Sequence, residues 1–247
     1  MSELRAHGGP YVAAYLPGGF PSREAFADLL PSLAESADLI EVGVPFTDPM
    51  ADGLTIQRAS RTALSDGTTL PWILEWLEHA VRHPALYLMT YLNPVLAFGV
   101  DRLATEARRA GVRGLVVPDL PLEEADLLRP LGDAGLEFVP LVAPTTPEGR
   151  LRRLCACQAS FVYAITRPGT TGGTAAVDGG LRSFLDRVRA VSGETAVLAG
   201  FGVRAPEQAA ALRRHADGVV VGSALVEDLE AGRDPLARLR ALREAME

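Results

Sequence analysis

Short apolar segments alternate with longer, helix-like segments along the whole chain. Eight of the apolar segments are typical of buried strands, and they span residues 11–16, 39–44, 85–91, 114–117, 136–142, 161–165, 195–198 and 218–221. This alternation predicts a parallel sheet, and eight repeats close naturally as a barrel. We therefore expect an α/β fold, with one (β/α)8 TIM-barrel domain over residues 1–247. An open doubly wound sheet is the alternative, but no Gly-x-Gly-x-x-Gly motif follows the first strand to support a dinucleotide-binding version.

Charge and composition exclude several classes of protein. The net charge of −7 argues against a nucleic-acid-binding surface, and no uninterrupted apolar run of about 18 residues suggests a transmembrane helix. The N-terminal residues lack the apolar core of a signal peptide. Cys155 and Cys157 are too close for an ordinary disulfide, and no nearby His completes a metal site. We expect a cytoplasmic protein with no metal, no nucleic-acid partner and no membrane association.

The segment 39–58 carries the strongest chemical signal. Glu41 interrupts an apolar strand, where an unpaired charge is costly, and Asp52 follows in the turn beyond that strand. Thr55 is the predicted N-cap of the next helix. Two carboxylates in a partly dry pocket can take acid and base roles, because their environments separate their pKa values. In the alternative, Glu41 pairs with an interior Arg or Lys and Asp52 only shapes the turn. We favour the functional pair, because the neighbouring strand segments contain no basic residue.

Glycines cluster after the last three predicted strands. Backbone N–H groups at such positions can cradle a phosphate, and the groups concerned are Thr171-Gly172-Gly173, Gly200-Phe201-Gly202 and Gly222-Ser223. Ser223 adds a hydroxyl and a predicted helix N-cap. Ordinary turn formation is the alternative for each glycine pair. The long loop 166–180 is rich in small residues and suggests a mobile lid, with an insertion of no function as its alternative.

Residues 41–53 read Glu-Val-Gly-Val-Pro-Phe-Thr-Asp-Pro-Met-Ala-Asp-Gly. This stretch resembles the signature of the tryptophan synthase alpha subunit family almost residue for residue, which is a highly specific match. Further motifs follow in the family's order, at 91–94, 117–121, 163–167, 171–172, 200–202 and 222–224. The resemblance covers nearly the whole chain, from about residue 11 to residue 226.

The resemblance implies a lyase reaction, the retro-aldol cleavage of indole-3-glycerol phosphate to indole and glyceraldehyde 3-phosphate. Glu41 matches the family's acid–base glutamate, and Asp52 matches the aspartate that accepts the indole N–H. Tyr163 matches a tyrosine beside the glutamate, and Thr171 matches a lid threonine that contacts the aspartate on closure. The positions that match phosphate-binding residues are Gly172, Phe201, Gly202, Gly222 and Ser223.

The resemblance also implies a partner. Family members dock on a tryptophan synthase beta subunit, giving an alpha2-beta2 heterotetramer for L-tryptophan biosynthesis, and pyridoxal phosphate is expected only in that beta subunit. Pro45, Asp48 and Pro49 match the loop that faces the partner, and no cofactor is expected in this chain. Two features depart from the family. The helix that usually precedes the first strand is nearly absent, because that strand starts near Tyr11, and Phe20 occupies a position where many members have Asp.

Three other functions remain open at this level. The nearest is a free-standing indole-3-glycerol phosphate lyase that releases indole without a beta partner, because the same catalytic residues serve both. A sugar-phosphate isomerase on the same barrel explains the phosphate loops but not the 41–53 motif. A phosphate-binding barrel that only activates a partner needs no catalytic pair, so the presence of Glu41, Asp52 and Tyr163 argues against it.

Overall fold

The computed structural model describes residues 9–79, 85–157, 159–166, 177–200 and 202–247. Within these ranges the strands form one parallel sheet in the order β5-β4-β3-β2-β1-β9-β8-β7-β6. The strands are β1 (Tyr11–Pro17), β2 (Leu39–Gly43), β3 (Ala85–Met89), β4 (Val112–Val116), β5 (Glu137–Phe138), β6 (Leu141–Val142), β7 (Phe161–Ile165), β8 (Ala196–Gly200) and β9 (Gly218–Val221). Every predicted strand segment is found, and the predicted (β/α)8 barrel is confirmed.

One predicted strand, 136–142, is divided into β5 and β6. Proline has no N–H to donate to a sheet, and Pro140 lies between the two pieces. The backbone still follows its neighbours, because the Val139 N–H donates to the Leu115 carbonyl and the Tyr163 N–H donates to the Pro140 carbonyl, each at 2.9 Å. The two ends of the sheet are therefore joined by the chain itself.

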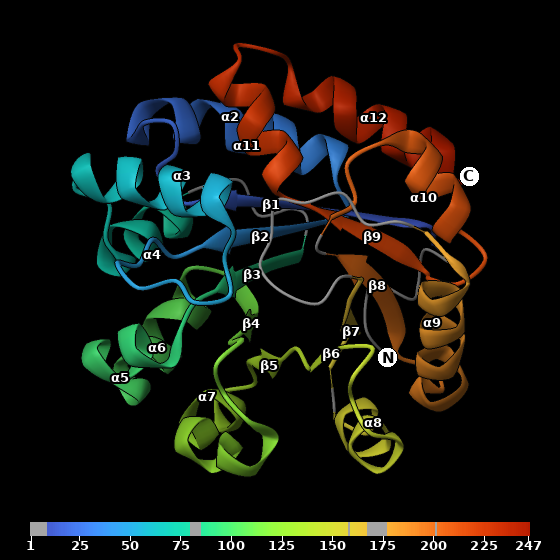
Figure 1. Cartoon of the computed structure of the whole chain (residues 1–247). Coiled ribbons are helices and arrows are strands. Elements are labelled where there is room, and N and C mark those ends of the chain that lie inside the picture. Colours follow the sequence, from blue (N-terminus) through green and yellow to red (C-terminus); the bar gives the residue numbers. More distant parts are fainter. Residues whose placement is uncertain (1–8, 80–84, 158, 167–176, 201) are drawn as a thin grey trace.

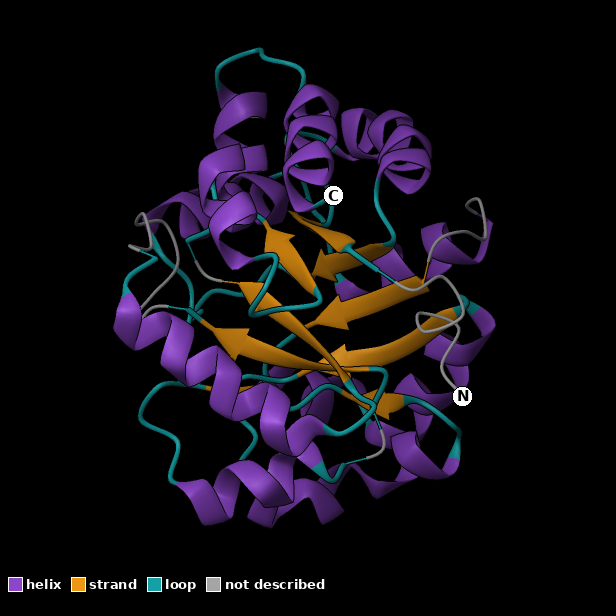
Figure 2. Cartoon of the chain, turned by 90° about the vertical axis from the view of Figure 1, so that its right-hand side faces the viewer, coloured by secondary structure: helices purple, strands orange, loops and turns teal. Residues whose placement is uncertain are grey.

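Helices surround the sheet on its outer side (Figures 1 and 2). They are α2 (Arg23–Ser36), α3 (Leu54–Ser65), α4 (Leu70–His79), α5 (Leu92–Phe98), α6 (Val100–Arg109), the 3-10 helix η1 (Leu122–Leu128), α7 (Arg129–Asp133), α8 (Glu148–Cys155), α9 (Gly179–Ser192), α10 (Pro206–Leu212), α11 (Ser223–Glu230) and α12 (Pro235–Met246). Helix α6 buries Leu103, Ala104 and Ala107, the spacing of one helix face turned toward a core. None of the described helices is both long and apolar enough to cross a membrane.

Two predicted helix caps are wrong. Gly53, not Thr55, occupies the N-cap position of α3, and Gly222, not Ser223, occupies that of α11. Neither helix has a side-chain cap hydrogen bond at that position. Each polar side chain therefore lies inside the first turn, where its hydroxyl does not cap the helix.

The strand register decides which side chains share the barrel interior. Tyr15 of β1, Glu41 of β2 and Tyr87 of β3 are register partners, so their side chains point to the same face of the sheet. The Tyr87 ring meets the Phe161 ring of β7 edge-on at 5.2 Å. Because β3 and β7 are separated by several strands in either direction along the sheet, this shared face is the interior of the barrel.

A second carboxylate of the barrel wall, Glu137, is fully partnered. It accepts hydrogen bonds from the Tyr87 hydroxyl at 3.1 Å, the Arg113 guanidinium at 3.0 Å, and both the N–H and hydroxyl of Ser160 at 2.8 Å. These contacts connect β3, β4, β5 and the start of β7 around the divided strand. Glu137 therefore has the partners expected of a structural acid, which makes it a useful contrast to Glu41.

Candidate active site

Glu41 lies in the middle of β2, and its side chain is buried, with 1% of the residue exposed. Neither carboxylate oxygen has a hydrogen-bond partner among the described residues. The alternative in which an interior Arg or Lys pairs with Glu41 is thus not supported by the described part of the chain. Burial, reinforced by the negative charge of Asp52, raises the pKa of Glu41 to about 8. The side chain is accordingly protonated at neutral pH.

Asp52 lies in the turn between β2 and α3 and is 4% exposed. Its Oδ2 accepts a hydrogen bond from the Tyr91 hydroxyl at 3.0 Å, and the Ala51 N–H donates to that same hydroxyl oxygen at 3.1 Å. Gln57 holds the backbone, since its amide donates to the Asp52 carbonyl at 2.8 Å. Burial raises the pKa of Asp52 to about 6, and the hydrogen bond from Tyr91 opposes that rise.

Two further tyrosines adjoin the carboxylates. Burial raises the pKa of both Tyr15 and Tyr163, and the negative charges of Asp52 and Glu41 raise it further. Glycines on adjacent strands make room for these rings. A Cβ at Gly43 would lie 2.3 Å from the Tyr15 hydroxyl, and one at Gly200 would lie 2.5 Å from the Tyr163 ring. The tyrosines and carboxylates therefore form one buried group inside the barrel.

Sequence reasoning missed Tyr15 and Tyr91 as members of this group. Both could have been considered on general grounds, because a tyrosine within or at the end of a barrel strand needs a partner for its hydroxyl. The register pairs Tyr15 directly with Glu41, which a strand alignment from the sequence could have indicated. The contact between Tyr91 and Asp52 joins residues from separate loops and has no local signal.

The predicted phosphate-binding residues are placed in part. Gly202 follows β8 with a φ of 112°, a conformation that favours glycine, and Gly222 with Ser223 follows β9 at the start of α11. Strands β8 and β9 are neighbours, so these residues share one edge of the barrel. A Cβ at Gly222 would lie 2.7 Å from the Tyr15 ring, which connects this edge to the carboxylates. Three other predicted site residues, Thr171, Gly172 and Phe201, lie outside the described residues.

The two carboxylates have complementary ionisation states. Between about pH 6 and pH 8, Glu41 is protonated while Asp52 is ionised. Glu41 is therefore a proton donor in an apolar environment, and Asp52 is a fixed anion beside it. Such a pair can protonate a substrate at one atom and stabilise the positive charge that this protonation creates.

Replacing Tyr91 with phenylalanine tests the contact with Asp52. Loss of the hydroxyl removes a hydrogen bond that stabilises the ionised carboxylate, so the pKa of Asp52 should increase from about 6. If activity needs ionised Asp52, the acidic limb of the pH–kcat/KM profile moves to higher pH, and the alkaline limb keeps its form. An acidic limb that does not move would show that Asp52 does not control it.

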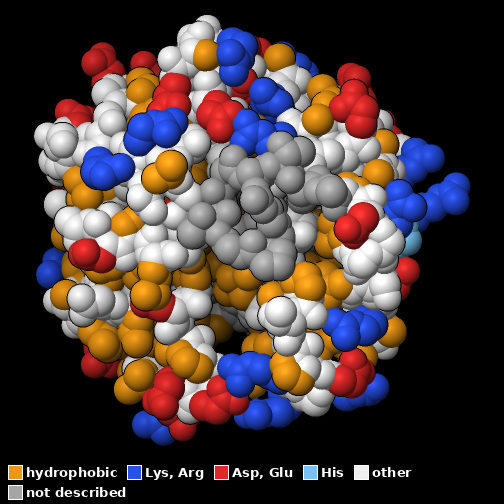
Figure 3. Space-filling view, in the orientation of Figure 1, with side chains coloured by type: hydrophobic (Ala, Val, Ile, Leu, Met, Phe, Trp, Pro, Cys, Tyr) orange, Lys and Arg blue, Asp and Glu red, His pale blue; other side chains and the backbone are white. Residues whose placement is uncertain are grey.

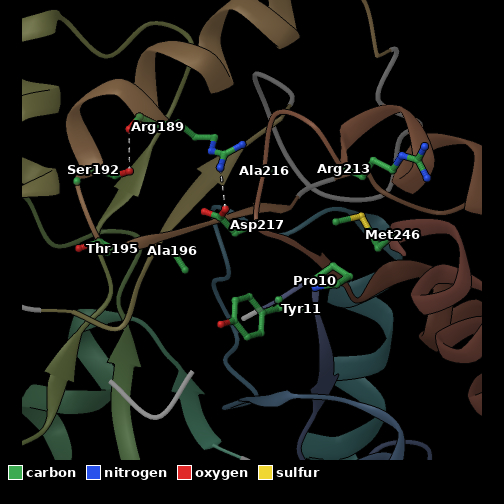
Figure 4. A pocket seen from close by; sticks show the side chains of 12 residues that line it. Pro10, Tyr11, Arg189, Ser192, Thr195, Ala196, Arg213, Ala216, Asp217 and Met246 are labelled. Carbon is green, nitrogen blue, oxygen red and sulfur yellow. Dashed lines mark hydrogen bonds and ion pairs between the residues drawn. The ribbon is translucent and has the colours of Figure 1, made fainter. Parts of the chain in front are cut away.

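A separate cavity of about 550 Å³ lies at the opposite end of the barrel. Tyr11 and Ala196, the first residues of β1 and β8, line it together with Asp217, which precedes β9. Figure 4 shows Arg189 reaching toward Asp217, and their side chains form an ion pair at 3.2 Å. Barrel chemistry takes place at the carboxyl ends of the strands, so this cavity is not the candidate active site.

In the described ranges, no three His, Cys, Asp or Glu side chains gather as a metal ion would need.

Comparison with known proteins agrees with the resemblance carried by residues 41–53. The family model described as tryptophan synthase alpha chain matches residues 1–247. The chain is 44% identical to the tryptophan synthase alpha chain of Gluconacetobacter diazotrophicus, over 100% of this chain and 94% of that protein. It is 42% identical to that of Nitratidesulfovibrio vulgaris, over 99% of this chain and 96% of that protein. The solved tryptophan synthase subunit alpha from Legionella pneumophila is 33% identical with a TM-score of 0.86, over 98% and 95% of the two chains. The chain therefore belongs to the tryptophan synthase alpha chain family.

Proposed function

We propose that the chain cleaves indole-3-glycerol phosphate to indole and glyceraldehyde 3-phosphate, as the alpha subunit of a tryptophan synthase in L-tryptophan biosynthesis. The observation that carries the proposal is the protonated Glu41, which has no hydrogen-bond partner in the described part of the chain and lies beside Asp52 in one buried site. The reaction needs an acid for a carbon atom and an anion for a developing cation. These two side chains supply both requirements.

Glu41 is the proposed acid and base of the retro-aldol step. It donates its proton to C3 of the indole ring, and the resulting carboxylate then accepts the proton of the adjacent glycerol hydroxyl. The bond between C3 and the hydroxyl-bearing carbon breaks, the hydroxyl becomes the aldehyde carbonyl, and the bond's electrons restore the indole ring. The glutamic acid is regenerated, so the atoms and protons balance without a cofactor in this chain.

Asp52 is the proposed acceptor of the indole N–H. Protonation at C3 places positive charge on the ring nitrogen, and a preorganised carboxylate in a dry site stabilises that charge in the transition state. The hydrogen bond from Tyr91 and the bond from Gln57 to the Asp52 backbone support this role, because they hold the acceptor in place before substrate binds. Tyr163 is the proposed neighbour of Glu41 that packs the reacting end of the substrate.

The phosphate is proposed to bind at the ends of the late strands. Gly202, Gly222 and Ser223 support this assignment, because they follow neighbouring strands and one of them begins a helix. Thr171, Gly172 and Phe201 belong to the same proposal on the strength of the family resemblance alone. Thr171 is further proposed to close a lid over the substrate and contact Asp52.

A beta subunit is the proposed partner, in an alpha2-beta2 assembly. Met50 and Leu54 flank Asp52 in the sequence and are 74% and 71% exposed, which is unusual for large apolar side chains. Figure 3 shows hydrophobic side chains gathered over the lower part of one molecular face. A partner that covers Met50 and Leu54 would communicate directly with the Asp52 turn, and Pro45, Asp48 and Pro49 belong to the same loop. We further propose a cytoplasmic location and one domain over residues 1–247.

The comparisons do not favour a free-standing lyase, because the family model and the relatives reported above are named tryptophan synthase alpha chain or subunit alpha. The two functions differ in their response to a partner. We expect the purified chain to release glyceraldehyde 3-phosphate slowly alone and much faster with a tryptophan synthase beta subunit. Fast release that is indifferent to the beta subunit would support the free-standing enzyme. No release in either case would remove the lyase proposal.

A further inference from the structure

Glu227 of α11 contacts two distant parts of the chain at once. Its Oε1 accepts a hydrogen bond from the Thr55 hydroxyl of α3 at 3.3 Å, and its Oε2 pairs with the Arg204 guanidinium of the β8–α10 loop. Helices α3 and α11 pack side by side, as Figure 1 shows. One half-buried carboxylate thus joins three elements that border the candidate active site.

The first contact leads to Asp52. Thr55 lies in the first turn of α3, and only Gly53 and Leu54 separate it from Asp52. The Thr55 side chain is buried, and its hydroxyl donates to Glu227 rather than capping the helix. Gln57 in the same turn donates to the Asp52 carbonyl. A change in the position of this helical turn is therefore transmitted to the Asp52 backbone.

The second contact leads to the proposed phosphate edge. Arg204 is two residues beyond Gly202, and Gln208 binds the intervening backbone, accepting from the Arg204 N–H at 2.8 Å and donating to the Gly202 carbonyl at 3.1 Å. Arg238 of α12 donates to the Arg204 carbonyl at 2.6 Å. This loop is held as a unit, so the ion pair between Glu227 and the Arg204 side chain also helps to position Gly202.

The helix that carries Glu227 is itself anchored. The next residue, Asp228, is buried and accepts hydrogen bonds from Arg233 at 2.8 Å and from Arg238. These contacts attach the second half of α11 to α12 and to the connection between them. Glu227 therefore projects from an anchored helix, and from there it contacts both Thr55 and Arg204.

We propose that Glu227 is a positioning residue that holds the Asp52 turn and the phosphate-side loop in a fixed relation, through Thr55 and Arg204. This inference rests on the proposed function. The contact with Thr55 acts on Asp52, which stabilises charge in the transition state, so loss of this contact lowers kcat. The contact with Arg204 acts on a loop that binds the phosphate in the ground and transition states alike, so loss of this contact raises KM.

Steady-state cleavage of indole-3-glycerol phosphate by single variants tests the two contacts of Glu227. Thr55→Val should lower kcat by roughly fivefold to tenfold with little change in KM, and Arg204→Ala should raise KM by a similar factor with little change in kcat. Glu227→Ala removes both contacts, so it should lower kcat and raise KM. Glu227→Gln keeps an acceptor for the Thr55 hydroxyl but loses the charge that Arg204 pairs with, so it should restore kcat and leave KM raised.

A double-mutant cycle and a matched control make the test specific. Thr55→Val added to Glu227→Ala should cause no further loss of kcat, because both remove the same contact. Glu230→Ala is the control, since Glu230 joins the same two helices through Arg58 at 3.0 Å without touching the Asp52 turn or the β8–α10 loop. It should leave kcat and KM unchanged.

Several outcomes overturn the inference. An effect of Glu230→Ala equal to that of Glu227→Ala would show that only general helix packing matters. Additive losses of kcat in the double variant would show that Thr55 and Glu227 do not act through one contact. Equal effects of Thr55→Val and Arg204→Ala on both kcat and KM would show that the two contacts have no separate roles. If Glu227→Ala fails to fold, the two single variants still decide the matter. A wild-type chain without cleavage activity would remove the proposed function and the inference together, whereas an active wild type with an unaffected Glu227→Ala removes the inference alone.

Discussion

Replacing Glu41 with glutamine is expected to abolish cleavage, lowering kcat by on the order of 10³-fold to 10⁴-fold, toward the upper end of the range for a general acid–base group. Glutamine has nearly the same shape as protonated glutamic acid, but its amide can neither donate a proton to indole C3 nor accept one from the glycerol hydroxyl. Single-turnover release of glyceraldehyde 3-phosphate measures the loss. A variant with near-normal turnover would remove Glu41 as the acid and base.

The same variant should remain folded, and its stability relative to wild type should depend on pH. The folded-state pKa of Glu41 is raised from 4.5 to about 8, so its favourable contribution is complete below pH 4.5 and is lost as pH increases through about 8. Glutamine does not titrate. The free energy of unfolding of the variant should therefore increase relative to that of wild type between pH 4.5 and about pH 8, by on the order of a few kcal/mol.

Urea unfolding at pH 5 and pH 8.5 measures this difference, and Glu137→Gln is the matched control. Glu137 shares the barrel wall but accepts from Tyr87, Arg113 and Ser160, so its replacement should destabilise the chain at both pH values. If Glu41→Gln instead destabilised the protein equally at both values, Glu41 would have a partner in the folded state, and its role as an unpaired acid would be wrong.

The fold was predictable because strand and helix patterns are local. Each predicted strand appears where the apolar residues indicated it, and the one division, at Pro140, follows from the missing N–H of proline. The helix caps were less predictable. Thr55 and Ser223 have side chains that favour an N-cap, but the N-caps are Gly53, two residues before Thr55, and Gly222, one residue before Ser223.

The catalytic carboxylates were identifiable from the sequence because a charge inside an apolar strand is itself a signal. Their surroundings were not. Tyr91 reaches Asp52 from a different loop, and Glu227 lies on a surface helix where its sequence suggests an ordinary solvated charge. Contacts of this kind depend on the barrel's closure, which brings α3 beside α11 and the first strand beside the last. Residue types and spacings contain no information about such pairs until the fold is known.

Asp52→Asn should lower kcat by on the order of 10²-fold to 10³-fold, the usual cost of losing one preorganised group that stabilises transition-state charge. KM should change little, because positive charge on the indole nitrogen appears only after C3 is protonated. Asparagine can still accept a hydrogen bond from Tyr91 and from the indole N–H, so the site keeps its shape. Steady-state kinetics measure the effect, and Asp186→Asn, which removes the charge of an exposed partner of His215, is the control expected to leave both constants unchanged.

The pH profile of Asp52→Asn gives a second, independent readout. The acidic limb near pH 6 should disappear, because the group that titrates there is gone. The alkaline limb should move below its wild-type position near pH 8, because the negative charge of Asp52 is one of the two causes that raise the pKa of Glu41. A profile that keeps both limbs in place would show that the two carboxylates do not interact. A normal rate would remove Asp52 from the chemistry, and the site would then depend on Glu41 alone.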